Sequence, residues 1–572
     1  MAVDVNVMVG GEAGQGVQAV GHILAKSLVR GGFWVFADQD YESRVRGGHN
    51  FFRVRASDRN VEAISEAVDV LVALNKESVA LHQKEVVSGG VVVFDGDKIK
   101  DIGEGGDLFA VPLERLAEES ARNKLMANTV ALGVVARLLG HDFGVLSGVI
   151  QDYFGVGDIS RANVAAAKAG YDYAATNFQR ALSYQMTPAG GTERMLLTGN
   201  DAIALGALAA GCKFMAAYPM TPTTSIMEYM AGKADELDIV VVQPEDEIAA
   251  INMVVGAAFA GVRAMTATSG GGFCLMVEGL GLAGMTETPI VVVEGQRAGP
   301  AIGLPTRTEQ GDLEFLIHAA HGEFPRAVLA PATVEEAFWS TIKAFNLAEK
   351  YQLPVIIVTD QHLASSYATV GKVDLSKVVI DRGWLLSETE LAKLGEYRRH
   401  QITDSGVSPR AMPLMGKTLV VTDSDEHNEA GHLIEDAETR TAMVRKRLRK
   451  LEGLREEMAQ PRTYGPAQAG ATLIGWGSTY GALKEAVDLA AKDGLGVNLV
   501  HLSELWPFPA QPTLRALQGV KKSFSVENNA TGQMAHLLRA ETGHQVTGKI
   551  LKFDGRPFSP DHILRQLKKE VS

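Results

Sequence analysis

Cysteine is nearly absent from this sequence of 572 residues. Only Cys212 and Cys274 occur, which excludes a disulfide framework and leaves too few thiolates for an iron–sulfur cluster with four cysteine ligands. Any such cluster therefore has to lie on another chain.

Long apolar runs and basic character are also missing. Apolar residues make up 46% of the chain, yet no window approaches the ~18 consecutive apolar residues of a membrane span. The opening residues, MAVDVNVMVGGEAGQGV, contain no basic leader, so we expect a soluble, cytoplasmic protein. The formal net charge of −13 disfavours nucleic acid and anionic membranes as partners, because both are negatively charged and electrostatic attraction to this chain is missing.

Changes in composition and apolar patterning divide the chain into four parts. This number is consistent with domains of roughly 100–200 residues each. Short Val-rich runs alternate with helical patterns over 1–186 and again over 187–410, which is typical of parallel strands joined by helices. Residues 411–465 are rich in charge, and 466–572 resume the α/β pattern. The predicted fold class is α/β, with several open, mainly parallel sheets.

The charged third part contains two segments that could suggest a ligand. The run RTAMVRKRLRKLEGLREEM is basic, but its apolar residues recur at helical spacing and acids are interleaved, which favours a solvated connector over a nucleic-acid site. The segment DSDEHNEAGHLIED places His427 and His432 among carboxylates. Their five-residue spacing and the lack of a clear ligand set favour a polar loop over a metal site.

A glycine turn near the N-terminus, GGEAGQGV, precedes a helical pattern. Its spacing, G-x-x-G-x-G, is the reverse of the dinucleotide fingerprint, which disfavours a nicotinamide site. A glycine turn before a helix suits a phosphate, and a tight packing turn explains the spacing equally well. Further on, Arg44 and Arg46 precede a glycine pair and could clamp phosphates or carboxylates, or form an isolated surface turn.

Three acids, Glu245, Asp246 and Glu247, open the apolar segment IAAINMVVGAAFAG. They follow a strand pattern, and ligands of open parallel sheets lie beyond the carboxyl ends of strands. First-turn acids also stabilise a helix dipole by about 0.3–1 kcal/mol each. That effect alone explains all three residues without any chemistry.

Several motifs together resemble the α subunits of the 2-oxoacid:ferredoxin oxidoreductases. Residues 218–222 read Tyr-Pro-Met-Thr-Pro, close to the family's Tyr-Pro-Ile-Thr-Pro, and QPEDEIAAINMVVGAAFAG, TATSGGG, EGQRAGP, GLPTRTEQGDL and PVIIVTD follow in order. The first part resembles the family's γ domain through its Gly-Gln-Gly turn and Arg-Gly-Gly element. The last part resembles its transketolase-C-like domain. The order γ then α is most like the 2-oxoglutarate enzymes.

The resemblance implies a function for each part of the chain. It implies a γ-like domain at 1–186, a thiamine diphosphate pyrimidine-binding domain at 187–410, a charged connector at 411–465 and a transketolase-C-like domain at 466–572. The implied enzyme is 2-oxoglutarate:ferredoxin oxidoreductase, or 2-oxoglutarate synthase. It converts 2-oxoglutarate and coenzyme A to succinyl-CoA and CO2 with electrons passing to ferredoxin, in a direction that the sequence leaves open.

The resemblance also implies that this chain is half of an active site. It lacks both the cluster cysteines and the Gly-Asp-Gly with a following Asn that marks a magnesium-diphosphate site. A partner β subunit is expected to hold the diphosphate, Mg²⁺ and a [4Fe-4S] cluster, in an (αβ)₂ heterotetramer, and no metal ligand is expected on this chain.

Glu247 matches the family's catalytic glutamate, because it precedes Gly256 by the family's spacing of nine residues. In the family this carboxyl group hydrogen-bonds N1′ of the aminopyrimidine. Such a group needs a water-poor pocket, where its pKa is tuned and the hydrogen bond is not lost to solvent.

The remaining site residues follow from the same resemblance. Thr221 and Arg297 are expected to bind the substrate, Arg297 through its 1-carboxylate, with Thr306 and Arg307 near a distal carboxylate. The cofactor-binding residues are expected to be Glu247, Pro222 and Gly271 for the pyrimidine, and Gly14, Gly16 and Arg46 for coenzyme A.

Three alternatives stay open at this point. Pyruvate or branched-chain 2-oxoacids could be the substrate within the family. A non-catalytic assembly subunit would keep the fold without the chemistry, although the joint presence of Glu247, Thr221 and Arg297 argues against it. A nicotinamide or flavin oxidoreductase would use the first glycine turn, against the reversed spacing.

Overall fold

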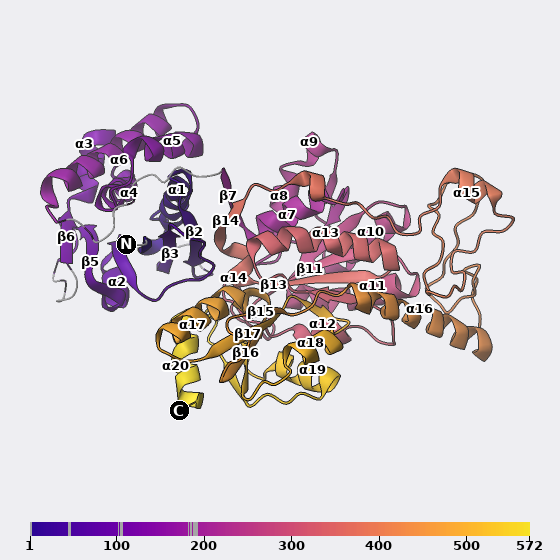
Figure 1. Ribbon diagram of the computed structural model, residues 1–572. Helices are drawn as coiled ribbons and strands as arrows, with labels where there is room; N and C mark the ends of the chain where they lie inside the picture. The colour runs from indigo at the N-terminus through magenta and orange to yellow at the C-terminus, as the bar shows by residue number, and fades with distance from the viewer. Residues whose placement is uncertain are drawn as a thin grey trace. The chain divides into compact units, whose positions relative to one another are not determined.

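The structure is a computed structural model that describes residues 3–43, 47–100, 102, 107–180, 182, 186 and 193–571. The chain divides into two compact units (Figure 1). The first consists mainly of residues 1–198, and the second of nearly all the rest. No helix in the described part of the chain is both long and apolar enough to cross a membrane.

The first unit is built on an eight-stranded mixed sheet in the order β6-β5-β4-β1-β3-β2-β14-β7. Its strands are β1 (Asp4–Ala13), β2 (Trp34–Asp40), β3 (Gly47–Ser57), β4 (Val68–Ala73), β5 (Val86–Asp95), β6 (Asp107–Val111), β7 (Arg194–Thr198) and β14 (Tyr367–Gly371). β1, β4, β5 and β6 are parallel, whereas β3 pairs antiparallel with β1 and β2. β3 is antiparallel to its neighbours within this mixed sheet, because β2 connects to β3 without the long crossover that a parallel pair needs.

The helices of the first unit pack their apolar sides on this sheet. They are α1 (Val17–Arg30), α2 (Lys76–His82), α3 (Leu113–Ala121), α4 (Ala127–Leu138), α5 (Phe143–Phe154) and α6 (Asp158–Asn177), with 3₁₀ turns η1 (Gln83–Glu85) and η2 (Lys124–Met126). Polar N-cap side chains stabilise the first turns of α2 and α5. Asn75 Oδ1 accepts a hydrogen bond from Ser78 N at 2.9 Å, and Asp142 Oδ1 accepts one from Val145 N at 2.9 Å.

The larger sheet of the second unit has the order β18-β12-β13-β11-β10-β8-β9. Its strands are β8 (Phe214–Ala216), β9 (Val240–Val242), β10 (Ala264–Thr268), β11 (Ile290–Gln296), β12 (Ala327–Leu329), β13 (Pro354–Asp360) and β18 (Glu504–Trp506). All pairs are parallel except β12 with β18. β11 and β13 are buried along their whole length, as expected of central strands in a sheet covered on both faces.

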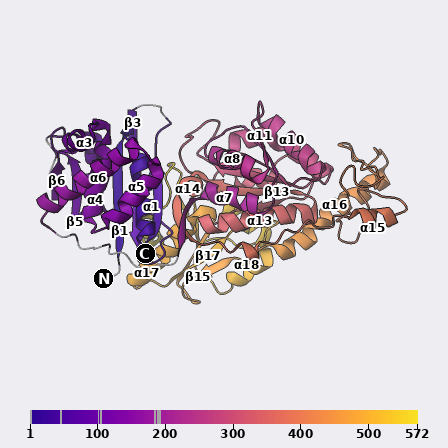
Figure 2. The same ribbon diagram turned by 90° about the horizontal axis from the view of Figure 1, so that it is seen from above.

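The helices that connect the strands of this sheet or follow them in the chain include two that are largely apolar. They are α7 (Gly199–Ala209), α8 (Thr224–Ala231), α9 (Ala234–Leu237), α10 (Glu247–Phe259), α11 (Gly270–Met285), α12 (Leu313–His318), α13 (Val334–Tyr351), α14 (Gln361–Ser365), α15 (Glu388–Lys393) and α16 (Ala437–Glu457), with η3 (Leu375–Lys377). α10 and α11 lie side by side (Figure 2), and a Cβ atom on Gly279 of α11 would lie 2.6 Å from the Ile251 side chain of α10.

A third sheet, of five strands in the order β15-β17-β16-β19-β20, completes the second unit. Its elements are β15 (Arg462–Tyr464), β16 (Ala471–Trp476), η4 (Gly477–Thr479), α17 (Tyr480–Lys492), β17 (Val497–Leu502), α18 (Ala510–Ala516), β19 (Ser523–Glu527), α19 (Gln533–Thr542), β20 (Gly548–Leu551) and α20 (Pro560–Val571). Residues such as Trp476 and Phe508 share one apolar core with α10, α11 and β11. The two sheets of this unit therefore stabilise each other.

The basic helix α16 departs from the sequence-based expectation of a solvated connector. Its buried residues include Lys446, Arg447 and Lys450, and both lysine side chains are 0% exposed. The lysines pair with the fully buried carboxylate of Glu287, and Arg447 makes a bidentate pair with Glu426 at 2.8 and 2.9 Å. The expectation was wrong because the acids that neutralise this face lie elsewhere in the sequence.

Candidate active site

The larger sheet of the second unit reverses its winding between β8 and β10. β9 lies outside β8 at one edge, and the next strand, β10, lies on the other side of β8. Ligands of open α/β sheets bind beyond the carboxyl ends of the strands at such a switch point. Thr221, Ser269 and Arg297 lie in the loops after β8, β10 and β11, and Glu247 is the first residue of α10, which follows β9.

The structure gives the three acids before α10 three different environments. Glu245 is exposed. Asp246 is the N-cap of α10, and its Oδ1 accepts a hydrogen bond from Ala249 N at 2.8 Å. Glu247 is 3% exposed, and within the described residues no donor reaches its Oε1 atom. Because buried polar atoms are nearly always hydrogen-bonded, this unpaired oxygen marks a place for a ligand.

The first turn of α11 closes over the Glu247 carboxyl group. A Cβ atom on Gly272 would lie 2.6 Å from Glu247 Oε1 and 2.1 Å from Thr268 Oγ1. A residue with a side chain could not approach so closely, so glycine is required at position 272. Gly271, in the same turn, is exposed, and the nearest atom to a Cβ placed there would be Ala301 O at 3.9 Å.

Thr221, Pro222 and Arg297 lie together next to this turn. Arg297 Nη1 donates to the backbone oxygen of Thr221 at 2.8 Å. Pro222, joined to Thr221 by a cis peptide bond, is buried, and a Cβ atom on Gly295 of β11 would lie 2.9 Å from its Cγ. Asn200 holds the far side of Pro222 by donating to its backbone oxygen at 2.7 Å.

Arg297 is a cation without a carboxylate partner among the described residues. Partial burial lowers its pKa from the ordinary value, but a guanidinium group stays protonated in proteins. One of its donors is used by Thr221 O, which leaves others for an anion. Such a partly buried arginine suits a bidentate carboxylate.

The loop after Arg297 folds back on itself. Ala298 N donates to Arg307 O at 3.3 Å, and Leu304 N donates to Ala298 O at 2.9 Å. Thr306 is 8% exposed, and a Cβ atom on Gly555 would lie 3.0 Å from Arg307 Cβ. The fold therefore places Thr306 and Arg307 in the same loop as Arg297, and their role with a distal carboxylate stays a prediction.

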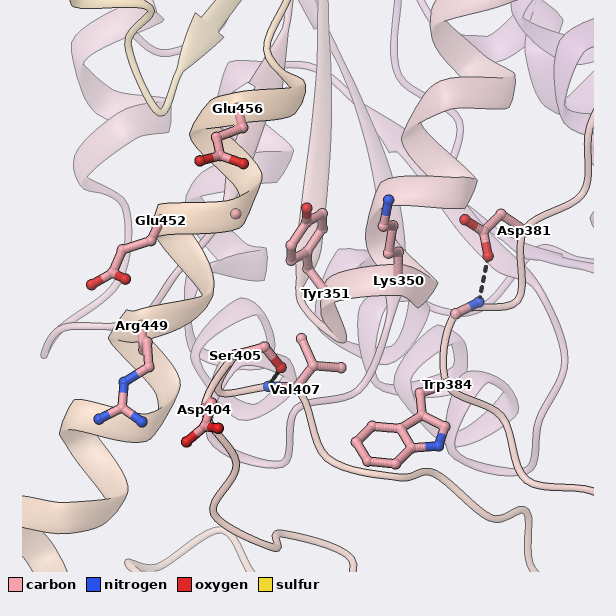
Figure 3. A pocket seen from close by; sticks show the side chains of 12 residues that line it. Lys350, Tyr351, Asp381, Trp384, Asp404, Ser405, Val407, Arg449, Glu452 and Glu456 are labelled. Atoms are coloured by element: carbon pink, nitrogen blue, oxygen red, sulfur yellow. Dashed lines mark hydrogen bonds between the residues drawn. The ribbon is translucent and has the colours of Figure 1, made fainter. Parts of the chain in front are cut away.

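A cavity of about 680 Å³ lies in another part of the second unit. Figure 3 shows Tyr351 and Lys350 at the end of α13, across from the helix α16 that carries Glu452 and Glu456, with Trp384 on a neighbouring loop. None of the candidate-site residues Thr221, Pro222, Glu247, Gly271, Gly272 and Arg297 lines it. This cavity therefore does not belong to the candidate site.

Three family models match successive parts of the chain. "Pyruvate ferredoxin/flavodoxin oxidoreductase" matches residues 6–173, "Pyruvate flavodoxin/ferredoxin oxidoreductase, thiamine diP-bdg" matches 205–446, and "Pyruvate:ferredoxin oxidoreductase core domain II" matches 469–563. The α subunit of a 2-oxoacid:ferredoxin oxidoreductase from Sulfolobus sp is 33% identical over 626 aligned residues, covering 99% of this chain and 96% of that protein. The chain belongs to the 2-oxoacid:ferredoxin oxidoreductase family, as an α subunit.

Two further proteins are similar to this α subunit. The 2-oxoglutarate synthase subunit KorA of Methanothermobacter marburgensis is 33% identical, over 66% of this chain and 99% of that protein. A solved structure of 2-oxoglutarate:ferredoxin oxidoreductase from Magnetococcus marinus, with 2-oxoglutarate, coenzyme A and succinyl-CoA bound, aligns over 100% of both chains with a TM-score of 0.93 and 33% identity.

The family and the fold class predicted from the sequence are confirmed. The three matched regions correspond to the three α/β sheets, which are mainly parallel in the thiamine diphosphate-binding and C-terminal regions. As an α subunit, this oxidoreductase chain works with a partner β subunit and a ferredoxin acceptor.

The glycine turn of the α subunit's N-terminal region lies in the first unit. Gly14 and Gly16 have left-handed φ values of 96° and 73°, and Gly16 is the N-cap of α1. A Cβ atom on Gly16 would lie 2.1 Å from Asn128 Nδ2, so packing alone already requires glycine there. Arg46 lies outside the described residues. The coenzyme A contact of this turn stays a prediction.

Sequence reasoning missed two acids beside the site of this α subunit. Glu294 lies within β11 and is fully buried, and Asp312 follows the Arg297 loop. The position of Glu294 inside the apolar run PIVVVEG could have revealed it, since strand interiors rarely bury an acid. No feature of the sequence around Asp312 indicated a role for that residue.

Proposed function

We propose that this α subunit supplies the pyrimidine-binding half of a 2-oxoglutarate:ferredoxin oxidoreductase. The reaction is the oxidative decarboxylation of 2-oxoglutarate with coenzyme A to succinyl-CoA and CO2, with two electrons passing to ferredoxin. Support for the substrate comes from the Magnetococcus marinus enzyme, which aligns over the whole chain and binds 2-oxoglutarate, coenzyme A and succinyl-CoA. The KorA protein adds a second 2-oxoglutarate relative.

The observation that carries the proposal is the buried carboxyl group of Glu247, with its unpaired Oε1 at the switch point. An aminopyrimidine has a ring nitrogen, N1′, that needs a carboxyl partner, and a thiamine diphosphate-binding family model covers this region. Gly271, one residue before the glycine that lies against Glu247, borders open space, since the nearest atom to a Cβ placed there is Ala301 O at 3.9 Å. The residues present therefore fit the cofactor's pyrimidine.

When bound, thiamine diphosphate supplies a nucleophilic carbon for the substrate's keto group and an electron sink for its decarboxylation. Glu247 would hold or accept the proton at N1′, and its burial keeps water from competing for that hydrogen bond. Pro222, pinned between Asn200 and β11, would flank the pyrimidine together with Gly271.

Arg297 and Thr221 would orient the substrate. The guanidinium group of Arg297 binds the 1-carboxylate, and its bond to Thr221 O fixes both residues in one geometry. The Thr221 side chain is partly exposed and would donate to the substrate's polar atoms. Holding the substrate in one orientation lowers the entropic part of the barrier.

The partner β subunit would complete the site. In this proposal it carries the diphosphate-binding residues, Mg²⁺ and the [4Fe-4S] cluster, in an (αβ)₂ heterotetramer. Large apolar side chains beside Glu247 are exposed in this chain: Ile248 and Met253 on α10 are 46% and 42% exposed, and Leu275 on α11 is 48% exposed. Such a patch around a functional group is typical of a subunit interface.

The test of the proposed function is a substrate comparison in the reconstituted complex. The complex should reduce ferredoxin with 2-oxoglutarate at a higher kcat/KM than with pyruvate or a branched-chain 2-oxoacid. This chain alone should show neither activity nor iron–sulfur absorption, because it has two cysteines. A preference for pyruvate would overturn the substrate assignment, and turnover by the isolated chain would overturn the shared site.

Replacing Arg297 with Lys should lower kcat/KM for 2-oxoglutarate by about 10- to 100-fold, since charge-assisted hydrogen bonds contribute roughly 1.5–3 kcal/mol. Lysine keeps the charge but cannot bind a carboxylate in the bidentate manner. Steady-state kinetics of the complex measure the effect, with Arg398→Lys as the control, because Arg398 forms solvent-accessible ion pairs with Glu396 and Glu429, which are not candidate-site residues. Wild-type kinetics for Arg297→Lys would contradict the role.

A further inference from the structure

Glu294 is a buried acid that the proposed chemistry does not use. It lies in the central strand β11, between Thr268 of β10 and Val358 of β13, and is 0% exposed. Within the described part of the chain, no hydrogen-bond donor reaches either of its carboxyl oxygens. An ionised carboxylate in this position would be desolvated and unpaired, which is a very unfavourable state.

The polar group that acts most strongly on Glu294 is a second carboxyl, that of Asp312, which follows the Arg297 loop and lies against the end of the same strand, β11. The backbone of Asp312 is fixed, because its N–H donates to Gln296 Oε1 at 2.9 Å. Two carboxyl groups can share a hydrogen bond only when one of them holds a proton.

The surroundings decide which acid holds the proton. Burial, and then the negative charge of Asp312, raise the pKa of Glu294 well above its ordinary value. Asp360 at the end of β13 and Cys274 on α11 act in the same direction. Burial raises the pKa of Asp312 as well, and the interaction with Glu294 offsets only part of that rise. Glu294 is therefore the acid that stays protonated.

The pair borders the same helix turn that closes over Glu247. A Cβ atom on Gly270, the first residue of α11, would lie 2.5 Å from Asp312 Oδ2. Two residues later, Gly272 approaches Glu247 Oε1 and Thr268 Oγ1, and Thr268 is the cross-strand neighbour of Glu294. Asp312 and Glu294 thus contact both the turn and the strand that position the Glu247 carboxyl group.

We propose that Glu294 is a positioning residue of this site: it holds a proton and donates it in a hydrogen bond to Asp312, which fixes the first turn of α11 against Glu247. Because Glu294 keeps this proton, Glu294 and Asp312 together carry one negative charge beside the site and not two. A second charge would repel an ionised Glu247 and favour its protonated form. The functional part of this inference rests on the proposed role of Glu247, whereas the shared proton does not.

Infrared difference spectroscopy of the holoenzyme at neutral pH tests the shared proton directly. The wild-type spectrum minus that of Glu294→Gln should contain the C=O stretching band of a protonated carboxylic acid. The absence of this band would overturn the proposal, whether the pair is then fully ionised or neutralised by a bound cation. Glutamine keeps the size of the side chain and an N–H donor for Asp312, so this variant tests the proton without removing the hydrogen bond.

Kinetics of the same complexes test the positioning role. Glu294→Gln should keep kcat within about threefold of wild type, and the pH profile of kcat unchanged, because the donor and the neutral charge are retained. Glu294→Leu should lower kcat by about 10- to 100-fold at a nearly unchanged KM, since small displacements of a catalytic group have effects of that size. An altered pH profile for Glu294→Gln, or a loss as large as that of Glu294→Leu, would overturn the role.

The two experiments separate this inference from the proposed function. If the complex fails to oxidise any 2-oxoacid, the infrared band still reports whether Glu294 and Asp312 share a proton. If the complex is active and the band is absent, the inference fails while the proposed function stands.

Discussion

Replacing Glu247 with Ala should lower 2-oxoglutarate-dependent ferredoxin reduction by about 10²- to 10⁴-fold, the usual contribution of a positioned acid or base. The fold should hardly change, because the carboxyl Oε1 has no protein donor to lose and a first-turn acid contributes at most about 1 kcal/mol. Ferredoxin reduction by the reconstituted complex and exchange of the thiazolium C2 proton should fall together. Thermal unfolding and subunit assembly should stay near wild type.

The neighbouring acids provide matched controls for this prediction. Glu245→Ala removes an exposed carboxylate and should leave both rates nearly unchanged. Asp246→Ala removes the N-cap of α10, so it should reduce stability by about 0.5–2 kcal/mol with a smaller effect on the rates. Wild-type proton exchange in Glu247→Ala, or a greater loss in Glu245→Ala, would show that the wrong acid was chosen.

Replacing Glu287 with Leu should destabilise the second unit by about 3–5 kcal/mol, the typical loss when one partner of a buried ion pair is removed. Although burial raises it, the positive charges of Lys446 and Lys450 bring the pKa of Glu287 well below its usual range. His400 Nδ1 adds a contact at 2.9 Å to Glu287 Oε1. Without this carboxylate, two fully buried ammonium groups have no counter-ion. The midpoint of urea unfolding measures the loss.

Two further variants show whether charge is the cause. Glu236→Ala breaks the exposed pair between Lys233 and Glu236 and should cost less than about 1 kcal/mol. Adding Lys446→Met and Lys450→Met to Glu287→Leu should recover most of the stability, since well-packed apolar residues can replace a buried ion pair. If the triple variant is no more stable than Glu287→Leu, or if Glu287→Leu costs no more than Glu236→Ala, the buried network does not stabilise the unit.

The sequence signals that point to the candidate-site residues are local. Strand patterns ending in Thr221, Glu247 and Arg297 follow from residues adjacent in the chain, and the parallel sheet brings those strand ends to one edge. The helix-dipole explanation suits Asp246, which caps α10, but not Glu247, which is buried with an unpaired oxygen. Only the packing of α11 against α10 separates these two acids.

The features that the sequence did not predict depend on contacts distant in the chain. β7 and β14 join the sheet of the first unit although they follow residue 186, and their short sequences do not specify a partner strand. The lysine face of α16 is buried because Glu287 lies more than a hundred residues earlier. The contact between Glu294 and Asp312 likewise forms only when the loop after Arg297 folds back.

Several expectations stay predictions. They are the domain boundaries at residues 186, 410 and 465, the cytoplasmic location, the (αβ)₂ assembly and the coenzyme A contact of Gly14, Gly16 and Arg46.

The most direct test of the shared active site is a structure of this α subunit bound to its β subunit and thiamine diphosphate. The distance from a Glu247 carboxyl oxygen to N1′ of the pyrimidine is the quantity to measure. We expect it within hydrogen-bond range, about 2.6–3.2 Å, with Pro222 and Gly271 beside the ring and the diphosphate held by the β subunit. A pyrimidine bound away from Glu247, or a diphosphate held by this chain, would contradict the account.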